Sequence, residues 1–145
     1  MIDEITSFEP SLAPSINKLL RQLTELSRPF SDDDLRRIVA DPASHLFVVR
    51  AESEVVAMLT LCCYSSPTSR KAWIEDVVVD NSFRGRGLGR ELVEYAKRYC
   101  QTQLTPCTLM LTSNPTRVVA NELYRSSGFE QKITNVYRLN CPDNE

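Results

Sequence analysis

The feature that most constrains the fold is an apolar stretch that runs directly into a glycine-dense, basic turn. Residues 73–79 have the β-branched and aromatic composition of a strand, and a helical pattern begins at Gly89. Three of the four glycines of the chain lie here, at Gly85, Gly87 and Gly89. Glycine allows positive φ and close approach of a ligand, and a helix N-terminus offers unpaired N–H donors. The segment therefore predicts a strand, turn and helix that bind a phosphate or pyrophosphate.

Basic side chains strengthen this prediction. Arg84, Arg86 and Arg90 lie in or beside the turn, although the formal net charge of the whole chain is -2. Glycines alone would favour a tight turn with solvated arginines, because short glycine motifs are common. The strand, the turn, the helix and the arginines together favour an anion site.

Two familiar nucleotide-binding patterns fit the turn poorly. A Walker loop places Lys and then Ser or Thr after its last glycine, whereas Arg90 and Glu91 follow Gly89 here. A dinucleotide-binding turn has the spacing G-x-G-x-x-G near the start of a βαβ unit, whereas these glycines are spaced by two. The Walker loop is excluded, and the dinucleotide pattern has little support.

The remaining elements predict one mixed α/β domain over residues 1–145, a length that suits a single domain without metal or disulfide support. The spacing of apolar residues predicts helices at residues 11–26, 32–41, 89–100 and 116–127. Runs rich in β-formers predict strands at residues 2–8, 45–50, 55–64, 73–79, 107–111, 129–133 and 136–139. This order predicts a mixed sheet of six to seven strands flanked by about four helices.

Composition limits the remaining function classes. A nearly neutral chain has no general attraction for nucleic acid or for an anionic membrane. The N-terminal residues lack the basic and apolar regions of a signal peptide, so we expect a cytoplasmic protein. The five cysteines lack the paired spacing of a zinc site, and His45 is the only histidine, so neither a metal site nor a histidine-dependent catalytic arrangement is expected.

Two motifs resemble the GNAT superfamily of acetyl-CoA-dependent N-acetyltransferases. Residues 84–89 match the phosphate-loop pattern Q/R-x-x-G-x-G/A, and residues 120–129 are similar to the segment A-x-x-L/F-Y-x-x-x-G-F. The element order fits too, so the resemblance spans nearly the whole chain, most strongly over residues 73–139. It implies a GNAT-like fold and transfer of the acetyl group of acetyl-CoA to a primary amine, by direct attack in a ternary complex.

The resemblance also implies where the coenzyme binds. The pyrophosphate would be held by Arg84, Gly85, Arg86, Gly87, Leu88 and Gly89, beside Arg90. The backbone of Val77, Val78 and Val79 would pair with the pantetheine arm, and an amide of this strand would stabilise the oxyanion. Many members carry an Asn near the pantetheine at the position where this chain has Arg117. Arg117 would either contact a coenzyme phosphate or be a solvated residue in the first turn of the helix. The side-chain amide of Asn114 or Asn121 would then replace the missing Asn.

The same resemblance makes Tyr124 the general acid that returns a proton to the departing thiolate; without it, Tyr124 would be interpreted as a core aromatic. Glu75 is the candidate base, and Asp76 is the reserve. Apolar neighbours should raise the pKa of an acid on this strand. Adjacent strand residues point to opposite faces, so at most one of the two should face the cleft. A substrate contact or a structural carboxylate is the alternative role for Glu75.

Several kinds of acceptor amine are compatible with the sequence. The resemblance implies a small-molecule or peptide amine, and an acceptor pocket built from residues 26–34 and 65–71. The strand at residues 74–79 is similar to that of glucosamine-6-phosphate acetyltransferases, which makes an amino sugar phosphate one option. The acidic run at residues 32–34 is better explained as a helix cap. A non-catalytic coenzyme A sensor and a nucleotide-binding module are the alternatives from other classes, and a homodimer is compatible with the resemblance.

Overall fold

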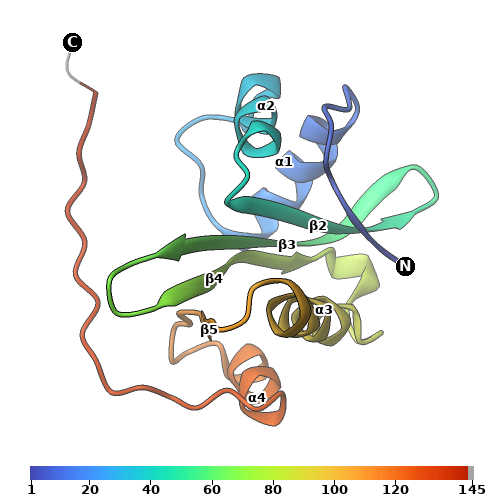
Figure 1. Ribbon diagram of the computed structural model, residues 1–145. Helices are drawn as coiled ribbons and strands as arrows, with labels where there is room; N and C mark the ends of the chain where they lie inside the picture. Colours follow the sequence, from blue (N-terminus) through green and yellow to red (C-terminus); the bar gives the residue numbers. More distant parts are fainter. Residues whose placement is uncertain (144–145) are drawn as a thin grey trace.

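The computed structural model describes residues 1–143, which form a five-stranded sheet in the order β1-β2-β3-β4-β5 (Figure 1). The strands are β1 (Ile2–Glu4), β2 (Ser44–Ala51), β3 (Glu54–Ser65), β4 (Arg70–Val79) and β5 (Thr108–Met110). The helices are α1 (Leu12–Leu23), α2 (Asp32–Ala40), α3 (Leu88–Gln103) and α4 (Val118–Ser126), with a 3₁₀ turn at Asn81–Phe83. Neighbouring strands are antiparallel from β1 to β4, and β5 is parallel to β4. The predicted mixed α/β class is confirmed.

Helices cover both faces of the sheet, with α1 and α2 on one side and α3 and α4 on the other (Figure 1). Strand β2 shows how its residues divide between two apolar clusters. Leu46 and Val48 belong to the cluster with α1 and α2, while Phe47 and Val49 belong to the cluster with α3. Because both faces are covered, the strand reads as a continuous apolar run, and the central strands form a firm base for the site.

The connection between α1 and α2 explains why α1 ends at Leu23, three residues before the predicted end. The Asn17 side chain accepts a hydrogen bond from the Phe30 amide and donates one to the Phe30 carbonyl, both at 2.8 Å. These bonds fold the connection back along α1. Ser31 and Asp34 form a capping box at the start of α2, which confirms that the acidic run serves as a helix cap.

A β-bulge interrupts β4. Met58 of β3 lies opposite Val78, but Thr60 lies opposite Glu75, so two β4 residues, Asp76 and Val77, oppose the single residue between them on β3. Asp76 has a φ of 50°, in the left-handed region that is costly for residues other than glycine. The bulge therefore bends β4 and turns side chains away from their regular alternation.

Strands β4 and β5 are paired over only a short length. The register joins Lys71, Ala72 and Trp73 to β5, and within residues 1–143 no strand lies beside the second half of β4 on that side. That half of β4 therefore keeps an unpaired edge, next to the segment that follows β5.

The strands predicted at residues 129–133 and 136–139 are wrong for this structure. Residues 129–143 contain neither helix nor strand and run away from the body of the molecule (Figure 1). A strand requires a neighbour with which it exchanges hydrogen bonds, and this extended segment has none within the described chain. The sheet consequently has five strands rather than six or seven. We call residues 130–143 the C-terminal arm.

Candidate active site

The glycine turn has the backbone that the sequence predicts. Gly85 and Gly87 have φ values of 79° and 81°, and a Cβ atom at either position would meet nothing within 4 Å. Glycine is therefore favoured by the backbone conformation and leaves open space above the turn. Gly87 is the N-cap of α3, so the first amides of the helix point out of the turn without helical partners. This geometry suits an anion.

Gly89 has a different role from the other two glycines. A Cβ atom there would lie 3.7 Å from Leu123 Cδ2 and 3.8 Å from Val79 Cγ2, and its φ is not positive. The small residue lets the start of α3 pack closely against α4 and the end of β4. It thus fixes the turn relative to the other elements that carry the predicted site residues.

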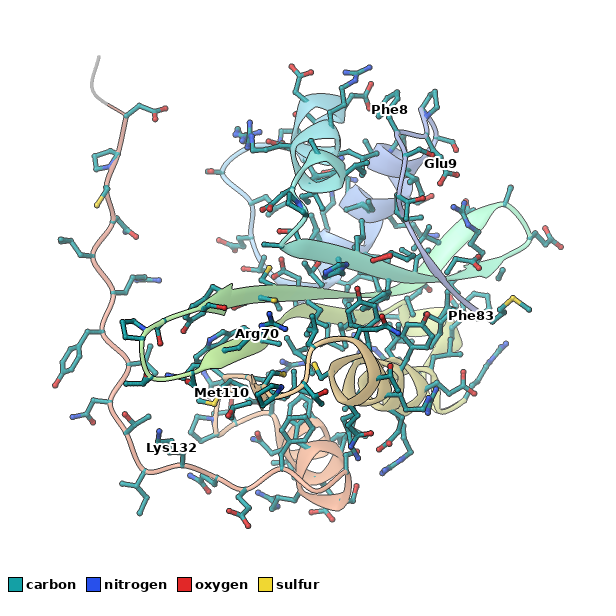
Figure 2. The ribbon with its side chains drawn as sticks, in the orientation of Figure 1. Phe8, Glu9, Arg70, Phe83, Met110 and Lys132 are labelled. Atoms are coloured by element: carbon teal, nitrogen blue, oxygen red, sulfur yellow. The ribbon has the colours of Figure 1, made fainter. Side chains whose placement is uncertain are left out.

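The three arginines take different positions. Arg84 Nε donates to the Val79 carbonyl (3.3 Å), and the Arg86 guanidinium lies 4.7 Å from the centre of the Phe83 ring. Figure 2 shows Phe83 beside the α3 end of the molecule. Arg90 instead reaches α4, where its Nη2 donates to Ser126 Oγ at 2.7 Å. Arg84 and Arg86 are exposed next to the turn, whereas Arg90 links two helices.

A cavity of about 160 Å³ lies between the bulged part of β4 and the segment after β5. Helix α1 contributes one lining residue, and α4 with its preceding turn contributes two. The lining residues are Leu23, Ile74, Glu75, Asp76, Val77, Leu111, Thr112, Arg117 and Tyr124. The fold thus places the two candidate bases, the predicted general acid Tyr124 and Arg117 around one cavity.

Tyr124 is both a core residue and a cavity residue. Its side chain is 7% exposed and packs edge-on against Phe129, with the ring centres 6.1 Å apart. Burial raises the pKa of the phenol, and the charge of nearby Arg117 opposes this increase. The hydroxyl therefore keeps its proton at neutral pH and is available as a donor.

Glu75 and Asp76 both line the cavity, so the expectation that at most one would face the cleft is wrong. The bulge is the reason, because it breaks the alternation of side chains at Asp76. Partial burial raises the pKa of both carboxyl groups, and the negative charge of Asp76 raises the pKa of Glu75 further. Their shifted pKa values bring them closer to the range of a useful base.

The two asparagines build the turn before α4. Asn114 Oδ1 accepts hydrogen bonds from the amide and hydroxyl of Thr116, both at 2.9 Å. Asn121 Nδ2 donates to the Asn114 carbonyl at 3.0 Å. These bonds hold the segment from which Arg117 reaches the cavity.

The three valines of β4 that were expected to pair with the pantetheine arm lie in different surroundings. Val77 lines the cavity, Val78 is buried in the core on the α1 side, and Val79 lies at the end of β4.

Neither segment expected to form an acceptor pocket contributes a residue to the lining of this cavity. Residues 65–70 line a second space of about 330 Å³ together with Thr105 and Pro106, at the β3–β4 turn. The cavity beside Tyr124 instead takes Leu23 from α1 and Leu111 and Thr112 from the end of β5. These three residues could not be predicted from the sequence, since their apolar or neutral side chains carry no chemical signal.

His45 lies outside the cavity lining. Its Nδ1 atom is 2.6 Å from Glu4 Oε1, and its ring packs against Tyr99 on α3. Within residues 1–143, no three His, Cys, Asp or Glu side chains are grouped closely enough to hold a metal ion. No helix in that range combines the length and apolar character needed to cross a bilayer.

Comparison with a family model identifies the chain as an acetyltransferase. The sequence matches the acetyltransferase (GNAT) family over residues 13–129, and the chain belongs to that family. No curated protein sequence matches it.

Solved structures extend the likeness over nearly the full chain. An acetyltransferase from Trypanosoma brucei is 26% identical, with a TM-score of 0.74, and the match covers 97% of this chain and 100% of that one. Glucosamine-6-phosphate N-acetyltransferase from Arabidopsis thaliana is 21% identical, with a TM-score of 0.73 and coverage of 96% and 98%. An aminoglycoside acetyltransferase from an uncultured soil metagenomic sample is 19% identical, with a TM-score of 0.75 and coverage of 97% and 96%. At these last two identities the likeness concerns the fold.

Proposed function

We propose that this protein transfers the acetyl group of acetyl-CoA to a primary amine by direct attack. The observation that carries the proposal is the cavity in which Tyr124, Glu75 and Asp76 meet beside the bulge of β4. The glycine turn follows the end of the same strand. A carrier bound at the turn could therefore extend along β4 towards the acid and the candidate bases.

The residues at the turn fit the diphosphate of coenzyme A. The space above Gly85 and Gly87 admits phosphate oxygens, and the first amides of α3 offer donors together with the positive end of the helix dipole. Arg84 and Arg86 add exposed positive charge. We assign the amides of residues 84–89 to the diphosphate and the unpaired edge of residues 77–79 to the amides of the pantetheine arm.

The proposed chemistry uses one proton acceptor and one proton donor. The amine nitrogen attacks the thioester carbonyl carbon, the C–N bond forms, and the C–S bond breaks. The Glu75 carboxylate accepts the proton released by the amine, directly or through water, with Asp76 as the reserve. The Tyr124 hydroxyl donates to the departing sulfur, which leaves as coenzyme A thiol. A backbone amide at the bulge stabilises the oxyanion, because Asp76 and Val77 lie outside the β3–β4 register.

One observation favours an amino sugar phosphate as the acceptor. Arg117 supplies the one cationic side chain among the described cavity residues. A guanidinium can bind a phosphate through two parallel hydrogen bonds, while the acids hold the amine end of the same molecule. A simple cationic amine would use the acids alone. The two acceptor classes therefore differ in their need for Arg117.

The test is an assay of released coenzyme A thiol with acetyl-CoA and a panel of amines, including glucosamine 6-phosphate, glucosamine, an aminoglycoside and a peptide. We expect amine-dependent thiol release by the intact chain, and a loss of it in Glu75→Gln combined with Tyr124→Phe. Arg117→Ala should weaken only the phosphorylated acceptor.

A ligand screen separates catalysis from simple binding. Acetyl-CoA and coenzyme A should raise the melting temperature by mass action, whereas ATP and NAD should not. Gly87→Glu, which brings bulk and negative charge into the diphosphate site, should lose the response to coenzyme A. Strong stabilisation by acetyl-CoA without amine-dependent thiol release would support a sensor in place of an enzyme.

A further inference from the structure

One side chain of α1 reaches the start of the glycine turn. Gln22 Nε2 donates a hydrogen bond to Asp80 Oδ2 (3.1 Å), and Gln22 Oε1 accepts one from the Asn81 amide (2.8 Å). The backbone N–H of Asn81 can only donate, so the oxygen of the Gln22 side chain has to face Asn81 and its nitrogen has to face Asp80. A single side-chain amide therefore joins α1 to two residues that lie 58 and 59 positions further along the chain.

Asp80 is the residue from which the turn begins. It precedes the 3₁₀ turn and is only 6% exposed. Its amide donates to the Val56 carbonyl of β3 (2.8 Å), and its Oδ1 atom accepts from the Ser82 amide (2.9 Å). The hydrogen bonds from Ser82 and then from Gln22 lower the pKa of the carboxyl group, so it is ionised at neutral pH. Because a buried carboxylate needs such partners, Asp80 holds the start of the turn in one position.

Lys18 makes a weaker contact with the same carboxylate. Its Nζ atom lies 3.8 Å from Asp80 Oδ2 and 3.9 Å from Glu54 Oε2, and its side chain is 60% exposed. Exposed ion pairs contribute little to stability. We therefore assign the link between α1 and the turn to the two hydrogen bonds of Gln22.

The same part of α1 borders the cavity. Leu23 follows Gln22 and lines the cavity together with Glu75. The helix ends here, where the Thr24 amide donates to the Leu20 carbonyl (2.9 Å). Consecutive residues of a helix are held in one rigid geometry, so a movement of Gln22 relative to the turn would also move this wall of the cavity.

We propose that Gln22 is a positioning residue, which holds the proposed coenzyme turn in its binding conformation and ties it to the wall of the acceptor cavity. The inference rests on the proposed function, because it takes residues 84–89 as the diphosphate site. Gln22 is outside the cavity lining, so its role is separate from those of Tyr124 and the two acids. Without the link, the turn would adopt its binding conformation for only a fraction of the time, and the apparent Kd of the coenzyme would rise by the inverse of that fraction.

The test exchanges the donor and the acceptor of one hydrogen bond. Gln22→Glu alone keeps the acceptor for Asn81 but places a carboxylate against that of Asp80. Asp80→Asn alone keeps an oxygen for the Ser82 amide but turns an amide nitrogen towards that of Gln22. When the two substitutions are combined, the carboxylate at position 22 again accepts from both neighbours, and the net charge equals that of the intact chain.

The first measurement is the affinity for coenzyme A by calorimetry, with no amine and no turnover. Each single variant should raise the Kd about tenfold, as expected for a turn that is competent about one-tenth of the time. The combined variant should return the Kd to within about twofold of the intact chain. Gln101→Glu is the matched control, because it makes the same change at an exposed position of α3 and should leave the Kd unchanged.

Urea unfolding of each variant separates positioning from stability. If the single variants were less stable but bound coenzyme A as the intact chain does, Gln22 would have only a structural role and the proposal would be overturned. A combined variant that bound as weakly as the single variants would overturn it as well.

Hydrogen exchange tests the connection to the cavity wall. Saturating coenzyme A should slow amide exchange at residues 20–26 of the intact chain about fivefold or more. This slowing should be lost in Gln22→Glu and should return in the combined variant. Equal slowing in the intact chain and in Gln22→Glu would show that α1 responds to the coenzyme without Gln22, which contradicts the inference.

Gly87→Glu separates failure of this inference from failure of the proposed site. If Gly87→Glu abolishes coenzyme binding while the Gln22 and Asp80 variants bind normally, the turn is the site but Gln22 does not position it. If Gly87→Glu binds coenzyme A as the intact chain does, the diphosphate lies elsewhere and both proposals are wrong.

Discussion

Replacing Tyr124 with Phe removes the proposed proton donor and leaves the packing of the ring in place. The aromatic ring is 7% exposed and keeps its edge-on contact with Phe129 in the variant. The loss of one hydroxyl should therefore change the free energy of unfolding by less than about 1.5 kcal/mol. Coenzyme binding should also be preserved, because the proposed diphosphate site lies on the turn at residues 84–89.

The size of the catalytic effect follows from the two pKa values involved. A free thiol has a pKa of about 8.5 and a free phenol a pKa of about 10, so full proton transfer to a free thiolate would be uphill by about 2 kcal/mol. Burial raises the pKa of Tyr124 and adds to this difference. The benefit therefore comes from donation to sulfur while negative charge develops on it. We expect turnover to fall about tenfold or more, which corresponds to at least about 1.4 kcal/mol of lost transition-state stabilisation.

The assay is thiol release under saturating acetyl-CoA and amine, with coenzyme affinity measured separately by calorimetry. Tyr95→Phe is the matched control, because Tyr95 is a half-buried tyrosine on α3 outside the cavity lining. The control should keep its turnover. If Tyr124→Phe turned over as fast as the intact enzyme, or lost activity only through weaker coenzyme binding, Tyr124 would not be the proton donor.

Three further predictions concern the acids and the glycines. Burial and the charge of Asp76 raise the pKa of Glu75, so the fall of kcat/KM at low pH should have its midpoint above the ordinary pKa of 4.5. Glu75→Gln should remove this fall. If the same pH dependence persisted in the variant, another group would be the base. The pKa of Asp76 is also raised in the folded protein, so ionisation of this carboxyl group opposes folding. The stability that the protonated group contributes is present below its ordinary pKa of 3.8 and is lost as the pH rises through the raised pKa. Asp76→Asn should therefore raise the melting temperature at pH 7 but not near pH 3, and a gain that does not vary with pH would refute this assignment. Gly87→Ala should lower the free energy of unfolding by about 1–2 kcal/mol, because its φ is 81°. Gly89→Ala, with ordinary contacts and a normal φ, should change it by less than about 1 kcal/mol in urea unfolding, and equal losses at both positions would contradict the distinct roles of these glycines.

The sequence predicts the helices and central strands well, because each depends on local periodicity and on recognisable caps. The capping box at Ser31 and the positive φ of Gly128 are examples of signals that act within a few residues. The absence of strands from residues 129–143 could not be predicted in the same way. Alternating apolar residues indicate that a segment is able to form a strand. Whether it does so depends on the position of a free sheet edge, and the local sequence pattern does not give that position.

The candidate site shows the same division. The glycine turn at residues 84–89 can be predicted, because its glycines and the start of the following helix are visible in the sequence. The bulge that brings Asp76 into the cavity has no glycine or proline to mark it, and its position depends on the register with β3. Leu23, Leu111 and Thr112 enter the cavity through tertiary packing alone. Motifs therefore identify the chemistry, and packing determines which neighbours shape the space around it.

The central claim is that the amides of residues 84–89 hold the diphosphate of the acetyl carrier, with its thioester beside the bulge of β4. A crystal structure of the complex with coenzyme A tests this claim directly. We predict diphosphate oxygens within hydrogen-bonding distance of those amides, and the pantetheine arm running along residues 77–79 towards Tyr124. A coenzyme bound elsewhere, with the turn left empty, would contradict the account.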